Sequence, residues 1–239
     1  MGKVVLLQGG PPGLTGVIAA TLLERGATVA LYGADNPASN AELAAMLKAH
    51  GDAMVVIPES KNDSGHFLSS MKMLYERFGD LSAIVNLYIP SAAQTEDTLA
   101  AYPRKLQEQV VAAGSFMVEK GIEGIVINQF VMSTNFVDHP LAYACAAARG
   151  AVTGVTRTAC IRFGKAGVRV VGLLVGLLDL PEIREFVSER VSAATTPLGR
   201  WITAHDVAGT VEFLALDSGY LTGQMLVLDG GTTSGVNGV

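Results

Sequence analysis

The stretch LLQGGPPGLTGVIAATLLERGATVALYG, residues 6–33, contains the pattern that decides the fold. An apolar, strand-like run ends in glycines, a helical pattern follows, and a second strand-like run begins at Thr28. Gly9, Gly13 and Gly16 predict a sharp turn with little steric obstruction, leading into a helix whose first amides can face a pyrophosphate. The alternative is a tight strand-to-helix turn without a ligand, but a glycine turn directly after the first strand favours a nucleotide.

The same alternation of strand and helix patterns continues to the end of the chain. Short apolar runs predict strands that are buried on both faces, as in a parallel sheet. They are Val4–Leu7, Thr28–Tyr32, Met54–Pro58, Ala83–Asn86, Gly124–Asn128, Arg169–Leu174 and Met225–Leu228. Helical patterns lie between and after them, at Leu14–Arg25, Ala41–His50, Gly65–Phe78, Tyr102–Lys120, Leu141–Phe163, Ile183–Ala193 and Ala204–Leu216. We therefore predict one α/β domain over residues 1–239, a doubly wound, Rossmann-like parallel sheet of about seven strands with helices on both faces.

Composition narrows the classes of partner and location. The net charge of −5 disfavours nucleic acid, which a basic patch would indicate. Two cysteines and four scattered histidines predict neither a disulfide framework nor a metal site. No apolar run reaches the roughly 18–20 residues that cross a bilayer, so we expect no membrane segment and a cytoplasmic protein. Only 16% of the residues are charged, which agrees with a surface partly covered by other subunits.

The glycine turn resembles the Thr-Gly-x-x-x-Gly-x-Gly loop of the short-chain dehydrogenase/reductase family. Gly9 and Gly13 match its first two glycines, whereas Gln8 replaces the threonine and Thr15 replaces the third glycine. The segment PLGRWITAHDVAGTVEFLALDSGYLTGQMLVLDGG, residues 197–231, is similar to the family's C-terminal segment almost residue for residue. This resemblance spans the whole chain and implies an NAD(P)-dependent oxidoreductase that acts on a small carbonyl or alcohol substrate.

The resemblance also implies a cofactor, NAD or NADP, and the positions that would hold it. These are Gly9, Pro12, Gly13, Leu14, Gly33, Asn86, Val175 and Gly176. Pro11 and Pro12 remove two backbone N–H donors from the turn. Gly33 stands where NAD-using members carry an acidic residue, with Asp35 two residues further on. No basic residue of the kind that NADP-using members offer lies between Gly9 and Asn36.

The family's motif after the fourth strand, Asn-Asn-Ala-Gly, corresponds here to Asn86–Ile89 and keeps only its first residue. Leu87, Tyr88 and Ile89 have large side chains, which we expect to crowd a nicotinamide ribose. The Pro-Gly pair after the sixth strand becomes Val175–Gly176, and the threonine that follows it in the family is missing. Neither these positions nor those around Gly33 indicate a preference between NAD and NADP.

The family's catalytic serine and Tyr-x-x-x-Lys pair can be sought in two registers. Counting forward from the predicted strand places Phe130 at the serine, Tyr143 at the tyrosine and Ala147 at the lysine. Counting backward from GVTRTACIRFGKAGVRVV, residues 154–171, places Cys145 and Arg149 at the tyrosine and lysine instead. An insertion of two residues costs less in a loop than inside a helix, where it would rotate later side chains by about 200°. We therefore favour the second register.

The candidate catalytic residues are accordingly Tyr143, Cys145, Arg149 and Ser133. Ser133 or Thr134 could approach the serine's place from the lengthened loop, and Tyr143 could enter from the turn before the helix. Cys145 has two interpretations: a thiolate whose pKa Arg149 lowers, or a small buried hydrophobic side chain, which we favour. The resemblance implies that the tyrosine position transfers a proton and that the neighbouring cation lowers its pKa.

Three functions stay open on the sequence. The first is an NAD(P)-dependent oxidoreductase with an atypical active site. The second is a non-redox enzyme such as a lyase or isomerase, or one similar to halohydrin dehalogenases, in which Arg149 stabilises an anion. The third is a catalytically silent subunit that partners an active relative. Small residues along Leu141–Phe163 and the family resemblance predict a homo-oligomer, a dimer or homotetramer.

Overall fold

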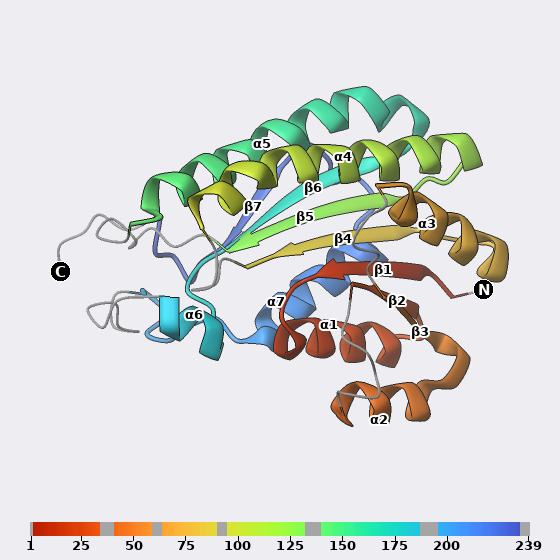
Figure 1. The fold of residues 1–239 in the computed structure, drawn as a ribbon, viewed down its shortest axis with the longest axis horizontal. Coiled ribbons are helices and arrows are strands. Elements are labelled where there is room, and N and C mark those ends of the chain that lie inside the picture. Colours follow the sequence, from red (N-terminus) through yellow and green to blue (C-terminus); the bar gives the residue numbers. More distant parts are fainter. Residues whose placement is uncertain are drawn as a thin grey trace.

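The computed structural model describes residues 2–33, 41–58, 64–89, 95–131, 140–186 and 196–234, and its centre is a seven-stranded parallel sheet (Figure 1). The strands are β1 (Val4–Gly9), β2 (Thr28–Tyr32), β3 (Met54–Ile57), β4 (Ala83–Tyr88), β5 (Ile125–Val131), β6 (Arg169–Val175) and β7 (Met225–Leu228). Their order is β3-β2-β1-β4-β5-β6-β7, and every neighbouring pair is parallel. The predicted doubly wound α/β fold is thus confirmed.

Helices cover both faces of this sheet (Figure 1). One face packs against α1 (Pro12–Glu24), α2 (Ala41–His50) and α7 (Ala204–Glu212). The other packs against α3 (Ser64–Phe78), α4 (Glu96–Lys120) and α5 (Ala142–Phe163). The short helix α6 (Pro181–Phe186), the 3-10 turns Gly51–Ala53 and Gly164–Ala166 and the π turn Phe213–Asp217 complete the described elements. Because side chains alternate along each strand, both faces bury apolar residues, which explains the continuous hydrophobic runs.

The first helix begins earlier than the sequence indicated, and this corrects the composition of the glycine turn. Helix α1 starts at Pro12, since proline is well suited to the first helical position. Gly13 and Gly16 therefore lie inside the helix. The turn itself is made by Gly9 and Gly10, whose φ angles are 75° and 79°.

Helix α4 also begins earlier, at Glu96 rather than at Tyr102. Thr95 forms a capping box with Thr98: the Thr98 amide donates to the Thr95 hydroxyl at 3.3 Å, and the Thr95 amide donates to the Thr98 hydroxyl at 3.0 Å. A threonine can thus take the role that glutamate or glutamine usually has at the third position. Pro103 lies within the helix without ending it.

The first and last helices of the chain pack against one another. Ile18 of α1 and Val207 of α7 belong to the same buried cluster. At the end of α1, Arg25 forms ion pairs with Glu212 and, at 3.3 Å, with Asp217. The N-terminal strand–helix unit is therefore completed by residues from the far end of the chain.

Candidate nucleotide-binding and catalytic site

The glycine turn lies at the carboxyl end of β1, where it passes close to β4. A Cβ atom on Gly9 would lie 2.7 Å from the carbonyl oxygen of Leu87. A Cβ atom on Gly10 would lie 2.8 Å from Thr15 Oγ1 and 3.1 Å from Leu87 Cβ. Thr15, at the place of the family's third glycine, donates its hydroxyl proton to the Gly9 carbonyl at 3.0 Å. Both turn positions thus combine a positive φ with a lack of room for a side chain, which only glycine satisfies.

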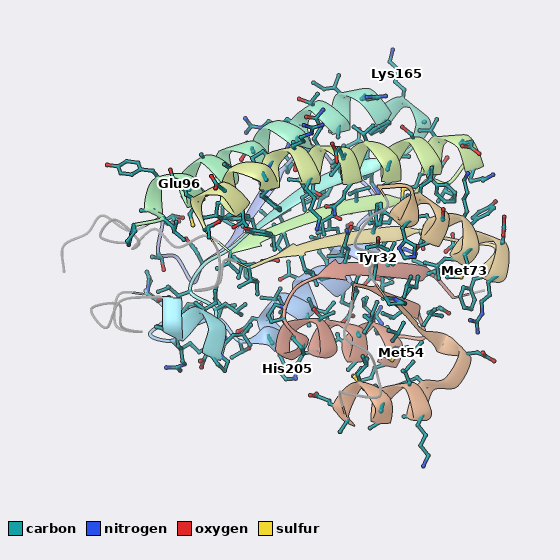
Figure 2. The ribbon with its side chains drawn as sticks, viewed as in Figure 1. Tyr32, Met54, Met73, Glu96, Lys165 and His205 are labelled. Carbon is teal, nitrogen blue, oxygen red and sulfur yellow. The ribbon has the colours of Figure 1, made fainter. Side chains whose placement is uncertain are left out.

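A cavity of about 240 Å³ opens on one side of this turn. It is bordered by Gly9 and Gly10, by Tyr32 and Gly33 at the end of β2, and by Glu42 on α2. The Tyr32 side chain, labelled in Figure 2, closes β2, and its hydroxyl lies 3.1 Å from Nδ1 of His66. The carboxyl ends of parallel strands are where open α/β sheets bind nucleotides, so this cavity has the expected location.

A second cavity, of about 360 Å³, opens on the other side of the same turn. Polar side chains from three elements border it: Gln8 from β1, Asn86 from β4, and Tyr102, Lys105 and Gln109 from α4. The α4 residues follow the spacing i, i+3 and i+7, which places them on one face of the helix. The two cavities together therefore flank Gly9 and Gly10 from both faces of the sheet.

A buried row of polar side chains crosses the sheet next to the second cavity. Gln8, Asn86 and Asn128 are neighbours in the register of β1, β4 and β5. Asn86 Nδ2 donates to Asn128 Oδ1 at 2.8 Å, and Asn128 Nδ2 donates to Thr156 Oγ1 on α5 at 3.1 Å. Within the described residues, Gln8 Oε1, Asn86 Oδ1 and the Tyr102 hydroxyl have no hydrogen-bond partner although they are buried.

These three atoms belong to residues that border the second cavity. The fourth buried side-chain atom without a partner among the described residues, Gln129 Nε2, belongs to β5. A buried polar group that lacks a hydrogen bond costs about 1–3 kcal/mol, so a ligand or water that pairs with it there is favoured. Burial, and secondarily the charge on Tyr88, raises the pKa of Tyr102, which keeps its hydroxyl protonated and able to donate. The residues around the turn therefore fit a polar ligand that has both hydrogen-bond donors and acceptors, such as a nucleotide.

The start of α1 offers fewer free amides than the glycine pattern suggested. Pro12 has no N–H, and the amides of Leu14 and Thr15 donate to the Pro11 carbonyl at 3.1 and 3.0 Å. A Cβ atom on Gly13 would touch Leu180 Cδ2 at 3.5 Å, so an apolar side chain lies beside this helix end. An anion at this position would depend mainly on the dipole of α1 and on the Gly13 amide.

Three aromatic rings pack together between α4 and the ends of β4 and β5. Tyr88 stacks on Phe130 with ring centres 5.2 Å apart and an angle of 10° between the planes. Tyr102 lies 3.9 Å from Tyr88, measured between ring centres. Phe130, which corresponds to the family's serine in the forward register, is only 1% exposed and has no group that donates or accepts a proton. The aromatic cluster of Tyr88, Tyr102 and Phe130 is thus a hydrophobic contact between the sheet and α4.

Helix α5 places the candidate catalytic residues in different environments. It is continuous from Ala142 to Phe163. Tyr143 is 90% exposed, whereas Cys145 is 7% exposed and belongs to the core. Arg149, one turn further along, is half-buried. Ser133 and Thr134 lie outside the described residues.

The interpretation of Cys145 as a thiolate with a lowered pKa is wrong in direction. Burial raises the pKa of this thiol. Its neighbours in the core are apolar, and desolvation disfavours the charged thiolate. Cys145 is therefore a small buried side chain, the interpretation that the sequence favoured.

Gly176 is explained by packing at the end of β6. Its amide donates to the Leu228 carbonyl at 2.8 Å, and a Cβ atom on it would lie 2.9 Å from the Cα of Asp229. The Asp229 carboxylate accepts hydrogen bonds from the amide and hydroxyl of Thr233 and from the Gly231 amide. Burial raises the pKa of Asp229, but these hydrogen bonds outweigh it and hold the pKa below its usual range. Val175, the last residue of β6, is buried.

Several residues around the turn were not identified from the sequence. Glu42 lies after the second strand in a helix that carries no motif, and its acidic character was the only available signal. Tyr102, Lys105 and Gln109 share a helical spacing that would have indicated one polar face of α4. Within the described residues, no group of three or more His, Cys, Asp or Glu side chains could hold a metal ion. Likewise, none of the described helices is long and apolar enough to cross a membrane.

Comparison with known proteins agrees with this geometry. Residues 12–233 match the family model described as enoyl-(acyl carrier protein) reductase, a model of short-chain dehydrogenases/reductases. The chain belongs to the short-chain dehydrogenase/reductase family. Members of this family are NAD(P)-dependent oxidoreductases.

Relatives of known activity match over nearly their full length. The 3alpha-hydroxysteroid dehydrogenase of Mediterraneibacter gnavus is 25% identical, covering 97% of each chain. The L-fucose dehydrogenase of Rattus norvegicus is 26% identical, covering 98% of this chain and 90% of its own. The crystal structure of a gluconate 5-dehydrogenase from Burkholderia cenocepacia, in complex with NADP and tartrate, is 27% identical with a TM-score of 0.80, covering 98% and 96% of the two chains.

Proposed function

We propose that this protein is an NAD(P)-dependent oxidoreductase of a small alcohol or carbonyl substrate, with an atypical group for proton transfer. The observation that carries the proposal is the glycine turn, which two cavities flank and beside which buried polar atoms lack partners. The family match over residues 12–233 and the dehydrogenase activities named for its relatives support it.

In this proposal the dinucleotide lies across the carboxyl ends of β1, β2 and β4. Gly9 and Gly13, with Pro12 and Leu14 beside them, would hold the diphosphate, and Gly33 would border the adenosine ribose. Gln8 Oε1 and Asn86 Oδ1 would accept hydrogen bonds from the ligand, since both are buried acceptors without a partner among the described residues. The nicotinamide, when bound, gives or takes the hydride. Val175 and Gly176 would border that end of the cleft.

We assign proton transfer to residues near the start of α5. Arg149 stands at the family's lysine position in the favoured register, and its guanidinium is permanently charged, so it would stabilise a developing alkoxide. Tyr143 provides the phenol, which must approach the substrate from the first turn of the helix. Ser133 is the candidate for a second hydroxyl donor. Cys145 is left out, because a neutral buried thiol is a poor proton donor to a carbonyl.

The proposal is tested first by binding and then by turnover. Calorimetric titration of the purified full chain with NADH and NADPH should detect one of them at submillimolar concentration. A panel of small alcohols and ketones, followed by nicotinamide absorbance, should then give turnover. Tyr143→Phe should lower kcat/KM by about 10²–10⁴-fold. Tyr220→Phe is the matched control, because Tyr220 is 99% exposed and borders neither cavity at the turn. Unchanged activity in Tyr143→Phe would remove this residue from the mechanism.

A second candidate function is that of a catalytically silent subunit beside an active relative. Two observations favour it. Phe130, which counting along the sequence assigns to the family's serine, is buried in the aromatic cluster. Cys145, which the favoured register assigns to the tyrosine, has a raised pKa. This candidate predicts no turnover over the whole panel. It also predicts that a second dehydrogenase-like chain co-purifies and is detected by native mass spectrometry.

A further inference from the structure

One charged residue stands out in the cavity between the glycine turn and α2. Among the described residues that border this cavity, Glu42 alone carries a charge. It lies in the first turn of α2, and its Oε1 is 3.9 Å from the place that a Cβ atom would occupy on Gly16. The carboxylate therefore extends from α2 across to α1, alongside the cavity.

The last described residue at the corner where β2 ends is Gly33, which has no side chain that could bind a ribose. Gly33 has a φ of 76°, and its amide donates to the Ile57 carbonyl at 2.9 Å. In dinucleotide-binding folds an acidic residue near this corner accepts hydrogen bonds from the ribose hydroxyls, whereas a basic residue receives a 2′-phosphate. In this chain the acidic group on the described part of the corner comes from a helix rather than from the strand.

Lysine and arginine are missing from the segment that forms β2 and the first part of α2. Residues 26–47 contain no lysine and no arginine. Arg25, the nearest arginine, pairs with Glu212 and Asp217 beside α7. Lys105 borders the second cavity, on the other side of the turn. Among the described residues that border the first cavity, a 2′-phosphate would thus meet a carboxylate and no lysine or arginine. A phosphate carries close to two negative charges at neutral pH.

We infer that Glu42 makes this site select NAD over NADP, by accepting hydrogen bonds from the adenosine ribose hydroxyls and repelling a 2′-phosphate. The inference rests on the proposed function, in that it requires a dinucleotide at the glycine turn. A carboxylate in the first turn of α2 also offsets the helix dipole, but that role makes no distinction between the two nucleotides.

The test uses ADP-ribose and its 2′-phosphate as probes, since these contain the adenosine half without the nicotinamide. Calorimetry on the full chain should show ADP-ribose binding at least about tenfold more tightly. In Glu42→Gln the ratio should fall to about threefold or less, and in Glu42→Lys it should reverse. Glu24→Gln, the same change at the exposed far end of α1, should leave the ratio unchanged.

Four results would overturn the inference. Equal affinity for the two probes in the unaltered chain overturns it alone and leaves dinucleotide binding intact. A preference that disappears in Asp35→Asn but persists in Glu42→Gln would show that Asp35, and not Glu42, makes the selection. Tighter binding of the 2′-phosphate that Lys105→Met abolishes would place that phosphate in the second cavity. Failure of both probes to bind would overturn the inference together with the cofactor part of the proposed function, and thermal unfolding of each variant verifies that it is folded.

Discussion

The close approach of the glycine turn to β4 makes a quantitative prediction about Gly9. Gly9 and Gly26 have nearly the same positive φ, 75° and 77°. A Cβ atom on Gly9 would lie 2.7 Å from the Leu87 carbonyl oxygen, whereas one on Gly26 would have no heavy atom within 4 Å. A positive φ of this size costs an alanine about 1–2 kcal/mol at either site. The entropy that alanine removes from the unfolded chain cancels in the comparison.

The difference between the two alanine variants therefore measures the contact with β4. Overpacking against a backbone atom typically costs about 1–3 kcal/mol, so Gly9→Ala should be destabilised by about that much more than Gly26→Ala. In a chain of this length each kcal/mol lowers the Tm by about 2–4 °C, giving an extra loss of roughly 2–12 °C. Urea unfolding and circular dichroism measure both variants. Equal destabilisation would refute the reasoning, because it would mean that β4 yields freely to a side chain at Gly9.

Three further predictions concern the core, the C-terminal turn and assembly. Phe130→Ala should lose about 3–5 kcal/mol in urea unfolding, because its ring is buried in the aromatic cluster; Phe213→Ala, at a 47% exposed position, should lose far less. Because the pKa of Asp229 is lowered in the folded state, the stability that this residue contributes is present above about pH 4 and is lost as the pH falls through the lowered pKa. Asp229→Asn should therefore weaken the acid dependence of the urea midpoint. An unchanged dependence in this variant would contradict the prediction. We expect a homo-oligomer through the groove between α4 and α5, so Gly154→Arg should give monomers in light scattering, whereas Gly209→Arg, an equally open helical glycine, should not.

The fold was predictable because burial on both sheet faces leaves an unambiguous sequence pattern. The strand ends were less so. The sequence predicts that the fourth and fifth strands end at Asn86 and Asn128, and asparagine is uncommon in strands. In the structure these two side chains bond one another across the sheet, which lets both strands continue to Tyr88 and Val131. A hydrogen bond between residues so far apart in the chain has no local signal.

The candidate site could be predicted only where a motif is continuous in the chain. The turn at Gly9 is such a case. Glu42 and Tyr102 reach the turn because α2 and α4 pack against opposite faces of the sheet, an arrangement that depends on tertiary contacts. The pKa of Cys145 likewise depends on burial, and the sequence around it contains nothing that determines whether the helix turns this residue inward.

The packing of α1 against α7 has a consequence for co-translational folding. The apolar side of α1 is synthesised first, but the helix that covers it begins only at Ala204. At translation rates of about 5–20 residues per second, the nascent chain waits roughly 9–36 s before its opening strand–helix unit can be enclosed. During that interval Ile18 and its neighbours are available to chaperones. A chain that is truncated before α7 would keep this hydrophobic surface of α1 exposed. We therefore expect chaperones and proteases to recognise the exposed face of α1, and the synthesis of α7 to determine whether that face becomes buried.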